Sequence, residues 1–239
     1  MIELFEGDCL DAMKQIPDAS VDALICDLPY GVTARNPWDA IIPFVDLWCA
    51  YERIVKESGA MVFTATQPFA SALVMSRPGL FKYEWIWRKQ QGTGFLNAKK
   101  QPLRNHEQVL VFYRKQPTYH PQMTEGKPYK CLSGEGSTDY GEQVRVVTEN
   151  KGERYPLTVQ EFKYDKNKLH PTQKPVALME YLIRTYTNEG ETVLDSCMGS
   201  GTTGVACIKT NRKFIGIEKD VKYFQVAKER MQELDPFIF

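Results

Sequence analysis

A glycine-rich segment near the C-terminus has the residue types that could hold a nucleoside. It reads DSCMGSGTTG over residues 195–204, follows an apolar run and leads into a stretch of helical character. Glycines allow the backbone to approach a ligand closely, and the first turn of a helix presents unpaired N–H groups. Glu218 lies at the expected tip of the next strand, where its carboxylate can accept hydrogen bonds from the two hydroxyl groups of a ribose. The residues expected to hold the ligand here are Asp195, Gly199, Ser200, Gly201, Thr202, Thr203 and Glu218.

The acidic residue at the head of this loop narrows the choice of nucleoside. The letters GxGxxG at 199–204 also occur in dinucleotide sites, but only about 35 residues follow, too few for the βα units that a second nucleotide requires. The lysine of a phosphate-binding loop is absent. Asp195 would repel a pyrophosphate and attract the ammonium group of an amino acid. A nucleoside that carries a cationic amino acid is S-adenosylmethionine; the alternative is a tight turn followed by a surface glutamate.

A second motif, Asp27-Leu28-Pro29-Tyr30, follows the apolar run 21–26 and suits the methylation of an amino group. The lone pair of an exocyclic amino group is delocalised into its ring, so the nitrogen attacks a methyl sulfonium poorly. A carboxylate that accepts one N–H and a carbonyl that accepts the other would direct the lone pair towards the methyl group. Asp27 offers the first acceptor and the Leu28 carbonyl the second, because Pro29 biases Leu28 towards an extended conformation. Tyr30 offers a ring on which a base turned out of its duplex can stack.

The strand and helix signals predict an alternating α/β chain with a doubly wound sheet. In such a sheet the carboxyl ends of the strands meet at one edge, so the two motifs can share one cleft. Residues 115–168 form a loop-rich insert in which only 144–148 reads as a strand. A tetrapeptide such as 27–30 is more often a simple turn, and the combination with the glycine loop is what predicts a site. The predicted strands are 21–26, 60–64, 81–87, 109–113, 192–195 and 214–217, and the predicted helices are a short one after Pro68 and 44–57, 175–187, 202–209 and 221–234.

Together these motifs resemble the amino-group DNA methyltransferases of the permuted β class. Residues 27–30 are similar to the family's catalytic Asp-Pro-Pro-Tyr, with leucine in place of the first proline. Residues 194–203 are similar to its cofactor loop, with Ser-Cys-Met where the family usually has Pro-Phe-Ala. The segment HPTQKP at 170–175 matches the one that flanks the methionine end of the cofactor, and Gly7-Asp8 resembles the acidic pair that reaches the cofactor's adenine. The motif order, catalytic motif first and cofactor loop last, defines the β class.

The resemblance implies a Rossmann-like, S-adenosylmethionine-dependent methyltransferase fold with a circularly permuted motif order. It divides the chain into a catalytic half at 1–114, a target-recognition insert at 115–168 and a cofactor-binding half at 169–239. It implies a site-specific enzyme of DNA methylation and of restriction-modification, acting on double-stranded DNA. The aspartate of the tetrapeptide favours the N6 amino group of adenine, since cytosine-N4 enzymes more often have serine there. By resemblance, Asp8, His170, Thr172 and Lys174 join the cofactor-binding residues.

Two alternatives stay open. One is methylation of cytosine N4 or of an amine outside DNA, and the other is a DNA-binding relative without activity. A cytosine-carbon methyltransferase is disfavoured, because no Pro-Cys dipeptide supplies its nucleophile. A homodimer is implied by the resemblance alone, and a restriction nuclease that works with this chain would be a separate protein.

The DNA is expected at a basic stretch between the two motifs. From Lys82 to Arg104 there are six basic residues and one acid, with four aromatic residues among them, and phosphates attract such a stretch. Gly92-Thr93-Gly94 predicts a mobile loop near the target. The alternative for this basic stretch is a solvated face over core aromatic residues. The alternative for residues 115–168 is a flexible lid. The expected DNA contacts are Arg88, Lys89, Lys99, Lys100 and Arg104.

Composition excludes several other classes of protein. The 239 residues include 30 basic and 30 acidic ones, which excludes a polybasic protein and an acidic disordered chain. Six cysteines without a CxxC pair and three histidines predict reduced core thiols and no metal site. No apolar run is long enough to span a membrane, and the acidic start predicts no signal peptide. A cytoplasmic location is therefore expected.

Overall fold

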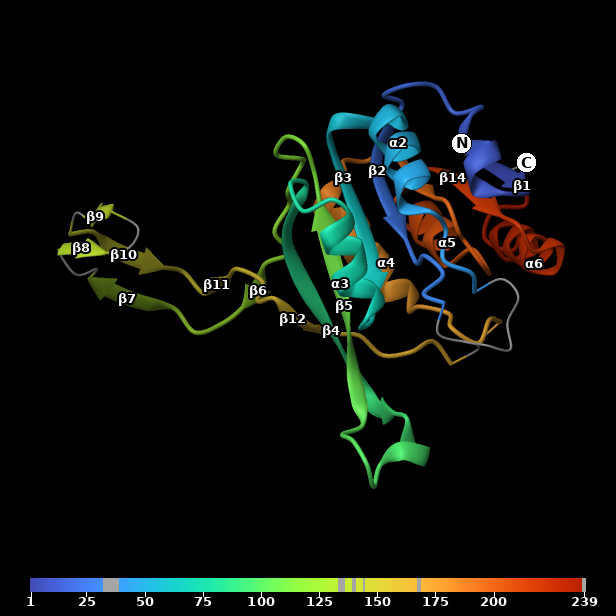
Figure 1. The fold of residues 1–239 in the computed structure, drawn as a ribbon. Helices are drawn as coiled ribbons and strands as arrows, with labels where there is room; N and C mark the ends of the chain where they lie inside the picture. Colours follow the sequence, from blue (N-terminus) through green and yellow to red (C-terminus); the bar gives the residue numbers. More distant parts are fainter. Residues whose placement is uncertain (32–38, 133–135, 139–140, 144, 167–168, 238–239) are drawn as a thin grey trace. The chain divides into compact units, whose positions relative to one another are not determined.

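The computed structural model describes residues 1–31, 39–132, 136–138, 141–143, 145–166 and 169–237. These residues form two compact units (Figure 1). The first consists of Met1–His120 with Thr158–Phe239, and the second of Pro121–Leu157. All of the sequence motifs described above lie in the first unit.

An eight-stranded sheet forms the centre of the first unit. β5 is antiparallel to both of its neighbours and all other paired strands are parallel, so the other strands end at the edge where β5 begins. This mixed sheet places residues from distant parts of the sequence at one edge. In spatial order the strands are β1 (Ile2–Glu6), β14 (Lys213–Glu218), β13 (Thr192–Asp195), β2 (Val21–Cys26), β3 (Val55–Ala65), β5 (Arg104–Phe112), β4 (Phe81–Thr93) and β12 (Val159–Glu161).

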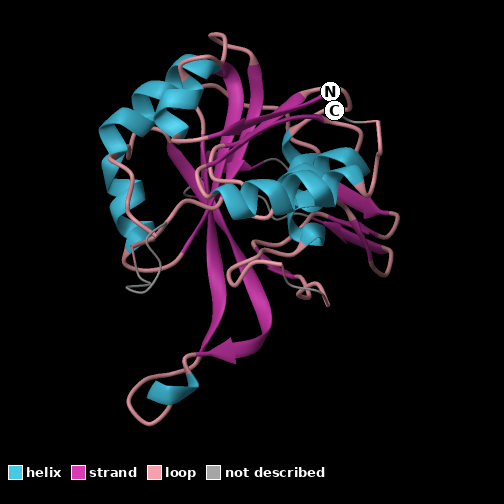
Figure 2. Cartoon of the chain, turned by 90° about the vertical axis from the view of Figure 1, so that its right-hand side faces the viewer, coloured by secondary structure: helices cyan, strands magenta, loops and turns pink. Residues whose placement is uncertain are grey.

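Helices cover both faces of the sheet, as Figure 2 shows. One face packs against α1 (Cys9–Met13), α2 (Phe44–Ile54) and α3 (Phe69–Ser76). The other face packs against α4 (Val176–Tyr186), α5 (Thr202–Lys209) and α6 (Val221–Gln232). The predicted doubly wound α/β fold is confirmed.

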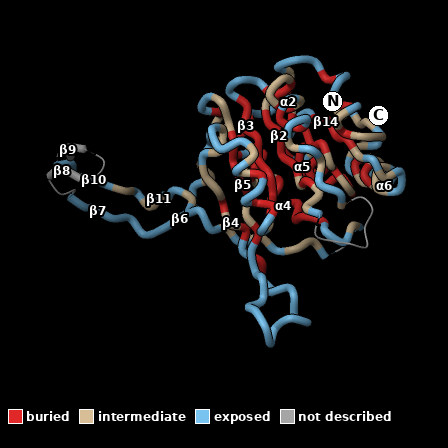
Figure 3. The backbone as a smooth tube through the Cα atoms, in the orientation of Figure 1, coloured by how far each residue is buried: buried red, intermediate tan, exposed pale blue. Residues whose placement is uncertain are grey.

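The sequence pattern explains why these elements form. In β2, Leu24 packs on one face of the sheet and Ile25 on the other, so a central strand reads as a continuous apolar run. In α4, Met179, Leu182 and Tyr186 recur at helical spacing and are buried against the sheet. Figure 3 shows the resulting core, in which the buried positions follow the central strands and the inner sides of the helices.

Several elements differ from the prediction. The predicted strand 81–87 continues to Thr93, and the next strand begins at Arg104. Residues 92–93 are therefore not the predicted loop but the end of a long β4–β5 hairpin, whose tip carries the short 3-10 helix η1 (Phe95–Asn97). β1 and α1 were not predicted, because their apolar residues form no clear alternation.

The described residues of the second unit form three antiparallel strand pairs. Its boundaries, Pro121–Leu157, lie inside the predicted insert 115–168, and β12 after it joins the sheet of the first unit. Residue 144 of the predicted strand 144–148 lies outside the described residues, and the observed strand is β10. The pairs are β7 (Tyr129–Leu132) with β10 (Val147–Asn150), β6 (Thr124–Glu125) with β11 (Glu153–Arg154), and β8 (Gly136–Thr138) with β9 (Gly141–Gln143).

The cysteines are all free thiols. Cys9, Cys26 and Cys207 are buried as predicted, whereas Cys49 and Cys131 are exposed. Within the described ranges, no group of three or more His, Cys, Asp or Glu side chains could hold a metal ion. No helix among these residues is long and apolar enough to cross a membrane.

Candidate active site

A cavity of about 670 Å³ lies at the edge of the sheet where the parallel strands end. Four predicted carboxylate residues line it, each directly after or at the end of a strand. Asp8 follows β1, Asp27 follows β2, and Asp195 and Glu218 end β13 and β14. The structure therefore places the two motifs in one cleft, as predicted.

Asp195 is a buried carboxylate at the start of the glycine loop, with 3% of its surface exposed. Its Oδ1 accepts a hydrogen bond from the Cys197 N–H at 3.1 Å, and its Oδ2 accepts one from the Thr203 hydroxyl at 2.6 Å. Burial raises the pKa of Asp195 to about 6, because removal from water disfavours the charged form. The carboxylate is thus held in one orientation and becomes charged within the range of ordinary buffers.

The glycines of the loop have two different roles. Gly199 lines the cavity, and its N–H donates to Glu218 Oε2 at 2.8 Å. Gly201 precedes α5 with a φ of +75°, and an added Cβ would lie 2.9 Å from the Cβ of Ala227 on α6. Gly201 therefore allows the loop to turn close to α6, and its predicted part in holding the ligand stays a prediction.

Glu218 and Asp8 form the far end of the cavity. Glu218 accepts hydrogen bonds only from backbone in the described chain, from Gly199 through Oε2 and from the Asp220 N–H through Oε1 at 2.8 Å. Burial raises its pKa. Asp8 caps α1 by accepting from the Leu10 N–H at 3.0 Å. Both carboxylates remain at the cavity wall, where hydroxyl or amino groups can reach them.

The segment HPTQKP passes between the two ends of the cavity. The backbone N–H of Thr172 donates to Nδ1 of His170 at 3.2 Å, and the His170 ring packs against Tyr223 on α6. Burial lowers the pKa of His170, so the ring is neutral at pH 7. Gln173 Oε1 accepts from the Ser200 hydroxyl at 3.4 Å, which ties this segment to the glycine loop. The predicted residues that line the cavity here are His170, Thr172, Lys174, Ser200, Thr202 and Thr203.

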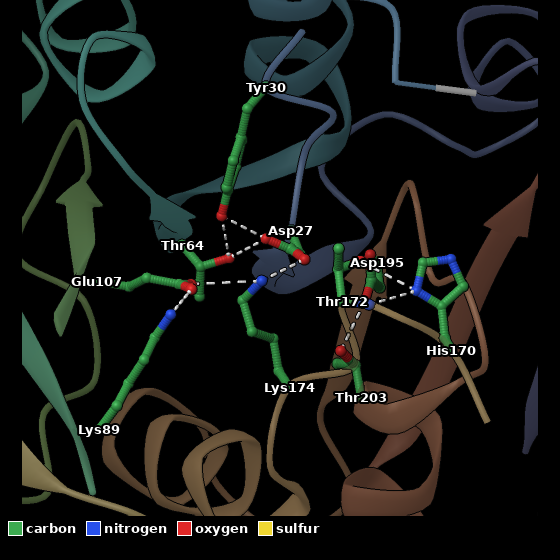
Figure 4. Close-up of polar contacts among 10 residues, drawn as sticks. All are labelled: Asp27, Tyr30, Thr64, Lys89, Glu107, His170, Thr172, Lys174, Asp195 and Thr203. Carbon is green, nitrogen blue, oxygen red and sulfur yellow. Dashed lines mark hydrogen bonds and ion pairs between the residues drawn. The ribbon is translucent and has the colours of Figure 1, made fainter. Parts of the chain in front are cut away.

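Asp27 lies at the other end of the cavity, surrounded by hydrogen-bond donors (Figure 4). Its Oδ1 accepts from the Tyr30 hydroxyl at 2.5 Å and from the Thr64 hydroxyl. Its Oδ2 accepts from the Lys174 ammonium at 2.5 Å. Burial and the nearby Asp27 charge raise the pKa of Tyr30 well above its ordinary value, so the phenol stays a proton donor.

Lys174 was predicted to bind the cofactor, yet its ammonium contacts Asp27. It also lies 3.4 Å from Oε2 of Glu107 on β5. Burial alone would lower the pKa of Lys174, but the Asp27 and Glu107 carboxylates raise it above its ordinary value. Lys174 therefore stays charged and keeps a positive charge beside Asp27.

The residues after Asp27 fix the backbone of the motif at 27–30 by packing. Leu28, which stands where the family has proline, is buried and packs in the core below α1 and α2. The Tyr30 ring is half-buried and packs on Phe69, with ring centroids 5.1 Å apart. Pro29 lines the cavity with them. Core packing thus fixes the backbone at Leu28 without the first proline.

The predicted DNA-contacting residues separate into two groups. Lys99, Lys100 and Arg104 are exposed on the β4–β5 hairpin, which extends beyond the sheet edge (Figure 3). Arg88 is exposed too, and its guanidinium pairs with Glu161. Lys89 is buried, and its ammonium donates to Glu107 Oε1 inside the cavity wall. Lys89 is therefore not available to a phosphate.

Sequence reasoning missed Thr64 and Glu107, both of which are close to Asp27 or its partner Lys174. Thr64 is the polar residue near the end of an apolar strand that was predicted. Glu107 lies two residues before the predicted strand 109–113, and its burial beside Lys89 and Lys174 depends on contacts between distant parts of the chain. His106 also lines the cavity.

Comparisons with known proteins agree with this arrangement. The family model described as DNA methylase, which covers N6 and N4 methyltransferases, matches residues 21–229. The type II methyltransferase M.HpaI of Haemophilus parainfluenzae is 30% identical over 242 residues, covering 94% of this chain and 72% of that protein. The DNA adenine methyltransferase YhdJ of Escherichia coli K12 is 27% identical over 257 residues, covering 95% and 82%.

A solved structure extends the likeness to three dimensions. The crystal structure of the M1.HpyAVI complex with S-adenosylmethionine has a TM-score of 0.66 and 28% identity, covering 96% of this chain and all of that chain. The predicted resemblance and methyltransferase fold are confirmed. The chain belongs to the family of S-adenosylmethionine-dependent DNA methylases that modify amino groups of bases.

Proposed function

We propose that this protein transfers a methyl group from S-adenosylmethionine to the N6 amino group of adenine in double-stranded DNA. The observation that supports it best is the arrangement of one cavity. Asp27 and its donors lie at one end, and Asp195, the glycine loop and Glu218 lie at the other. Methyl transfer requires one part of the cavity to hold the methyl donor and another part to hold the amino group that accepts the methyl.

The residues at the cofactor end fit S-adenosylmethionine. The buried charge of Asp195 suits an ammonium group, and Glu218 can accept hydrogen bonds from ribose hydroxyls. Asp8 suits the amino group of an adenine ring. When bound, S-adenosylmethionine supplies a methyl group on a positively charged sulfur. His170, whose pKa is lowered by burial, lines the cavity with these carboxylates and adds no full positive charge to it.

The residues at the acceptor end orient an amino group. The Asp27 carboxylate accepts one N–H of the base, and the Leu28 carbonyl accepts the other. This draws the nitrogen lone pair out of conjugation with the ring and directs it to the methyl carbon. The proton that nitrogen loses on methylation goes to Asp27 and then to solvent. No residue of the chain forms a covalent intermediate.

The choice of adenine rests on the aspartate at position 27 and on the likeness to YhdJ, whose name gives adenine as its target. The burial of Leu28 supports an active enzyme, because the carbonyl is fixed even though the first proline of the motif is absent. Nucleoside analysis distinguishes adenine N6 from cytosine N4, the other target within the family.

The DNA contacts proposed here are the hairpin residues Lys99, Lys100 and Arg104, together with Arg88. The hairpin supports this role because Thr93, Arg104 and His106 at its base line the cavity that would receive the flipped base. The insert, with its polar residues, is proposed to read the target sequence. A cytoplasmic location, a homodimer and a separate restriction nuclease stay predictions.

The test is methylation of duplex DNA with labelled S-adenosylmethionine, followed by nucleoside analysis of the digested product. The proposal predicts label in N6-methyladenine for the wild type. Label in N4-methylcytosine would contradict the adenine assignment, and no label on a library that contains all short sequences would contradict the activity.

A further inference from the structure

One carboxylate oxygen near Asp27 is buried without a hydrogen bond. Glu107 Oε1 accepts from Lys89, but Oε2 accepts no hydrogen bond within the described residues. Its neighbour is the Lys174 ammonium at 3.4 Å, an ion-pair distance longer than a charge-assisted hydrogen bond of about 2.8 Å. Buried polar atoms are nearly always satisfied, so this oxygen calls for an explanation.

The Lys174 ammonium occupies the position beside Asp27 that the amino group of the substrate must take. Asp27 Oδ1 already has two donors, Tyr30 and Thr64, so Oδ2 is the oxygen with room for another. Lys174 is bound to that oxygen at 2.5 Å. It also lies 5.6 Å from the centroid of the Tyr30 ring, whose other neighbour is Phe69. A base that stacks on Tyr30 and donates to Oδ2 therefore meets Lys174.

The two observations fit together if Lys174 can change partner. A shift of roughly 1 Å directed away from Asp27 would bring its ammonium from 3.4 Å to hydrogen-bond distance of Glu107 Oε2, and would stretch its 2.5 Å contact with Asp27 Oδ2 to the limit of a hydrogen bond. The side chains of Lys174 and Glu107 are 6% and 10% exposed, so the movement takes place out of water, where a charge needs a partner at each end. Glu107 supplies that partner, and Lys89 on its other oxygen keeps it in place.

We propose that Lys174 passes from Asp27 to Glu107 when the target base enters, so that Glu107 is a positioning residue that clears Asp27 for the amino group. This inference rests on the proposed function. With Lys174 moved away, the charge of Asp27 is less compensated and polarises the amino group more strongly. When the base leaves, Lys174 returns to Asp27 and neutralises it in the free enzyme.

The test is a double-mutant cycle of Glu107→Gln and Lys174→Met, measured as single-turnover methyl transfer with DNA and cofactor saturating. Glu107→Gln removes the charge that receives Lys174, so we expect the rate to fall about 30-fold while the dissociation constants of cofactor and DNA change less than about 2-fold. In the Lys174→Met background, where no lysine must move, the same change should cost less than about 3-fold. Such coupling is what a shared interaction produces.

Two further variants keep the result interpretable. Glu107→Asp retains the charge that Lys89 requires but withdraws the acceptor by one methylene, so it should fold and show the same selective loss of rate. Asp22→Asn removes a carboxylate paired with Lys56 at the opposite edge of the sheet and should leave the rate unchanged. Thermal unfolding of each variant checks that the fold is intact.

Equal penalties for Glu107→Gln with and without Lys174 would overturn the transfer of Lys174, as would wild-type rates in both Glu107 variants. Neither result would affect the proposed function, which fails only if the wild-type protein does not methylate adenine.

Discussion

The two ends of the cavity are built in different ways. At the cofactor end, Asp195, the glycine loop and Glu218 come from one continuous piece of chain, β13–α5–β14, and their partners are local backbone and hydroxyl groups. At the acceptor end, Asp27 is held by Thr64 and Lys174, which are 37 and 147 positions away in the sequence. The centre of the cofactor end is therefore a local structure, to which Asp8 and His170 are added from elsewhere in the chain, whereas the acceptor end exists only in the folded sheet.

This difference has a physical consequence for function. The donors to Asp195 are fixed by the loop itself, so this carboxylate can stay in one state through the reaction. The donors to Asp27 include the charged side chain of Lys174, which also lies 3.4 Å from Glu107, so under the proposed transfer the surroundings of Asp27 change when a substrate binds. We expect substitutions at the cofactor end to affect binding and substitutions at the acceptor end to affect the rate.

The largest effect is expected for Asp27→Ala. Removing the acceptor leaves the amino lone pair conjugated with the ring and leaves Lys174 without its main partner. Methyl transfer should fall by roughly 10²- to 10⁴-fold, the usual contribution of a positioned acid–base group. The measurement is methyl incorporation into duplex DNA, and an unchanged rate would exclude the role of Asp27.

The next largest effect is expected for Asp195→Asn. The change keeps the shape of the side chain and removes its charge, so the ammonium group of the cofactor loses a charged acceptor. Affinity for S-adenosylmethionine should fall roughly 10- to 100-fold, since a hydrogen bond to a charged group contributes about 1.5–3 kcal/mol. Isothermal titration calorimetry checks this, with Asp22→Asn as the matched control.

The same residue predicts how cofactor binding depends on pH. The pKa of Asp195 is raised to about 6, and the ammonium group prefers the ionised carboxylate. Affinity should therefore be at its plateau above pH 7 and decrease as pH falls through 6, to about one tenth of the plateau at pH 5. In Asp195→Asn this dependence should vanish; a persistent dependence would assign it to another group.

The smallest effect is expected on the hairpin, where charges are exposed and act through phosphate contacts. Lys99→Gln with Lys100→Gln should weaken DNA binding without changing cofactor affinity. The slope of log affinity against log salt should fall by about 0.9 for each lost contact. The control is Lys56→Gln with Lys209→Gln, because these two lysines lie near the start of β3 and at the end of α5, away from the cavity. If both double variants show the same slope, the hairpin is not part of the DNA interface.

The same comparison explains which parts of the site the sequence could predict. Residues 192–218 contain a strand, a glycine loop, a helix and an acid in order, and each signal is local, so β13, α5 and the place of Asp195 at the strand end were predicted correctly. The role of Asp195 in holding the cofactor stays a prediction. The doubly wound fold followed from that order. The close approach of Gly201 to α6 is a contact that a local motif does not reveal.

The acceptor end could be predicted only in part. Asp27 was found from its motif, but Thr64, Glu107 and the actual partner of Lys174 depend on which strands lie side by side. Lys89 was placed with the DNA-binding residues because its neighbours are basic. Its side chain is instead buried against Glu107, since β4 and β5 pair so that the two residues share the cavity wall. Charge along a sequence does not say which side chains point inward.

The central claim is that one cavity has a cofactor end and an acceptor end with separate tasks. It is tested most directly by measuring methyl transfer of Asp195→Asn and Asp27→Asn while the concentration of S-adenosylmethionine is raised to saturation. The account predicts that Asp195→Asn recovers most of the wild-type rate and that Asp27→Asn, which binds the cofactor normally, stays at least about 100-fold slower. Recovery of Asp27→Asn by added cofactor, or failure of Asp195→Asn to recover, would contradict it.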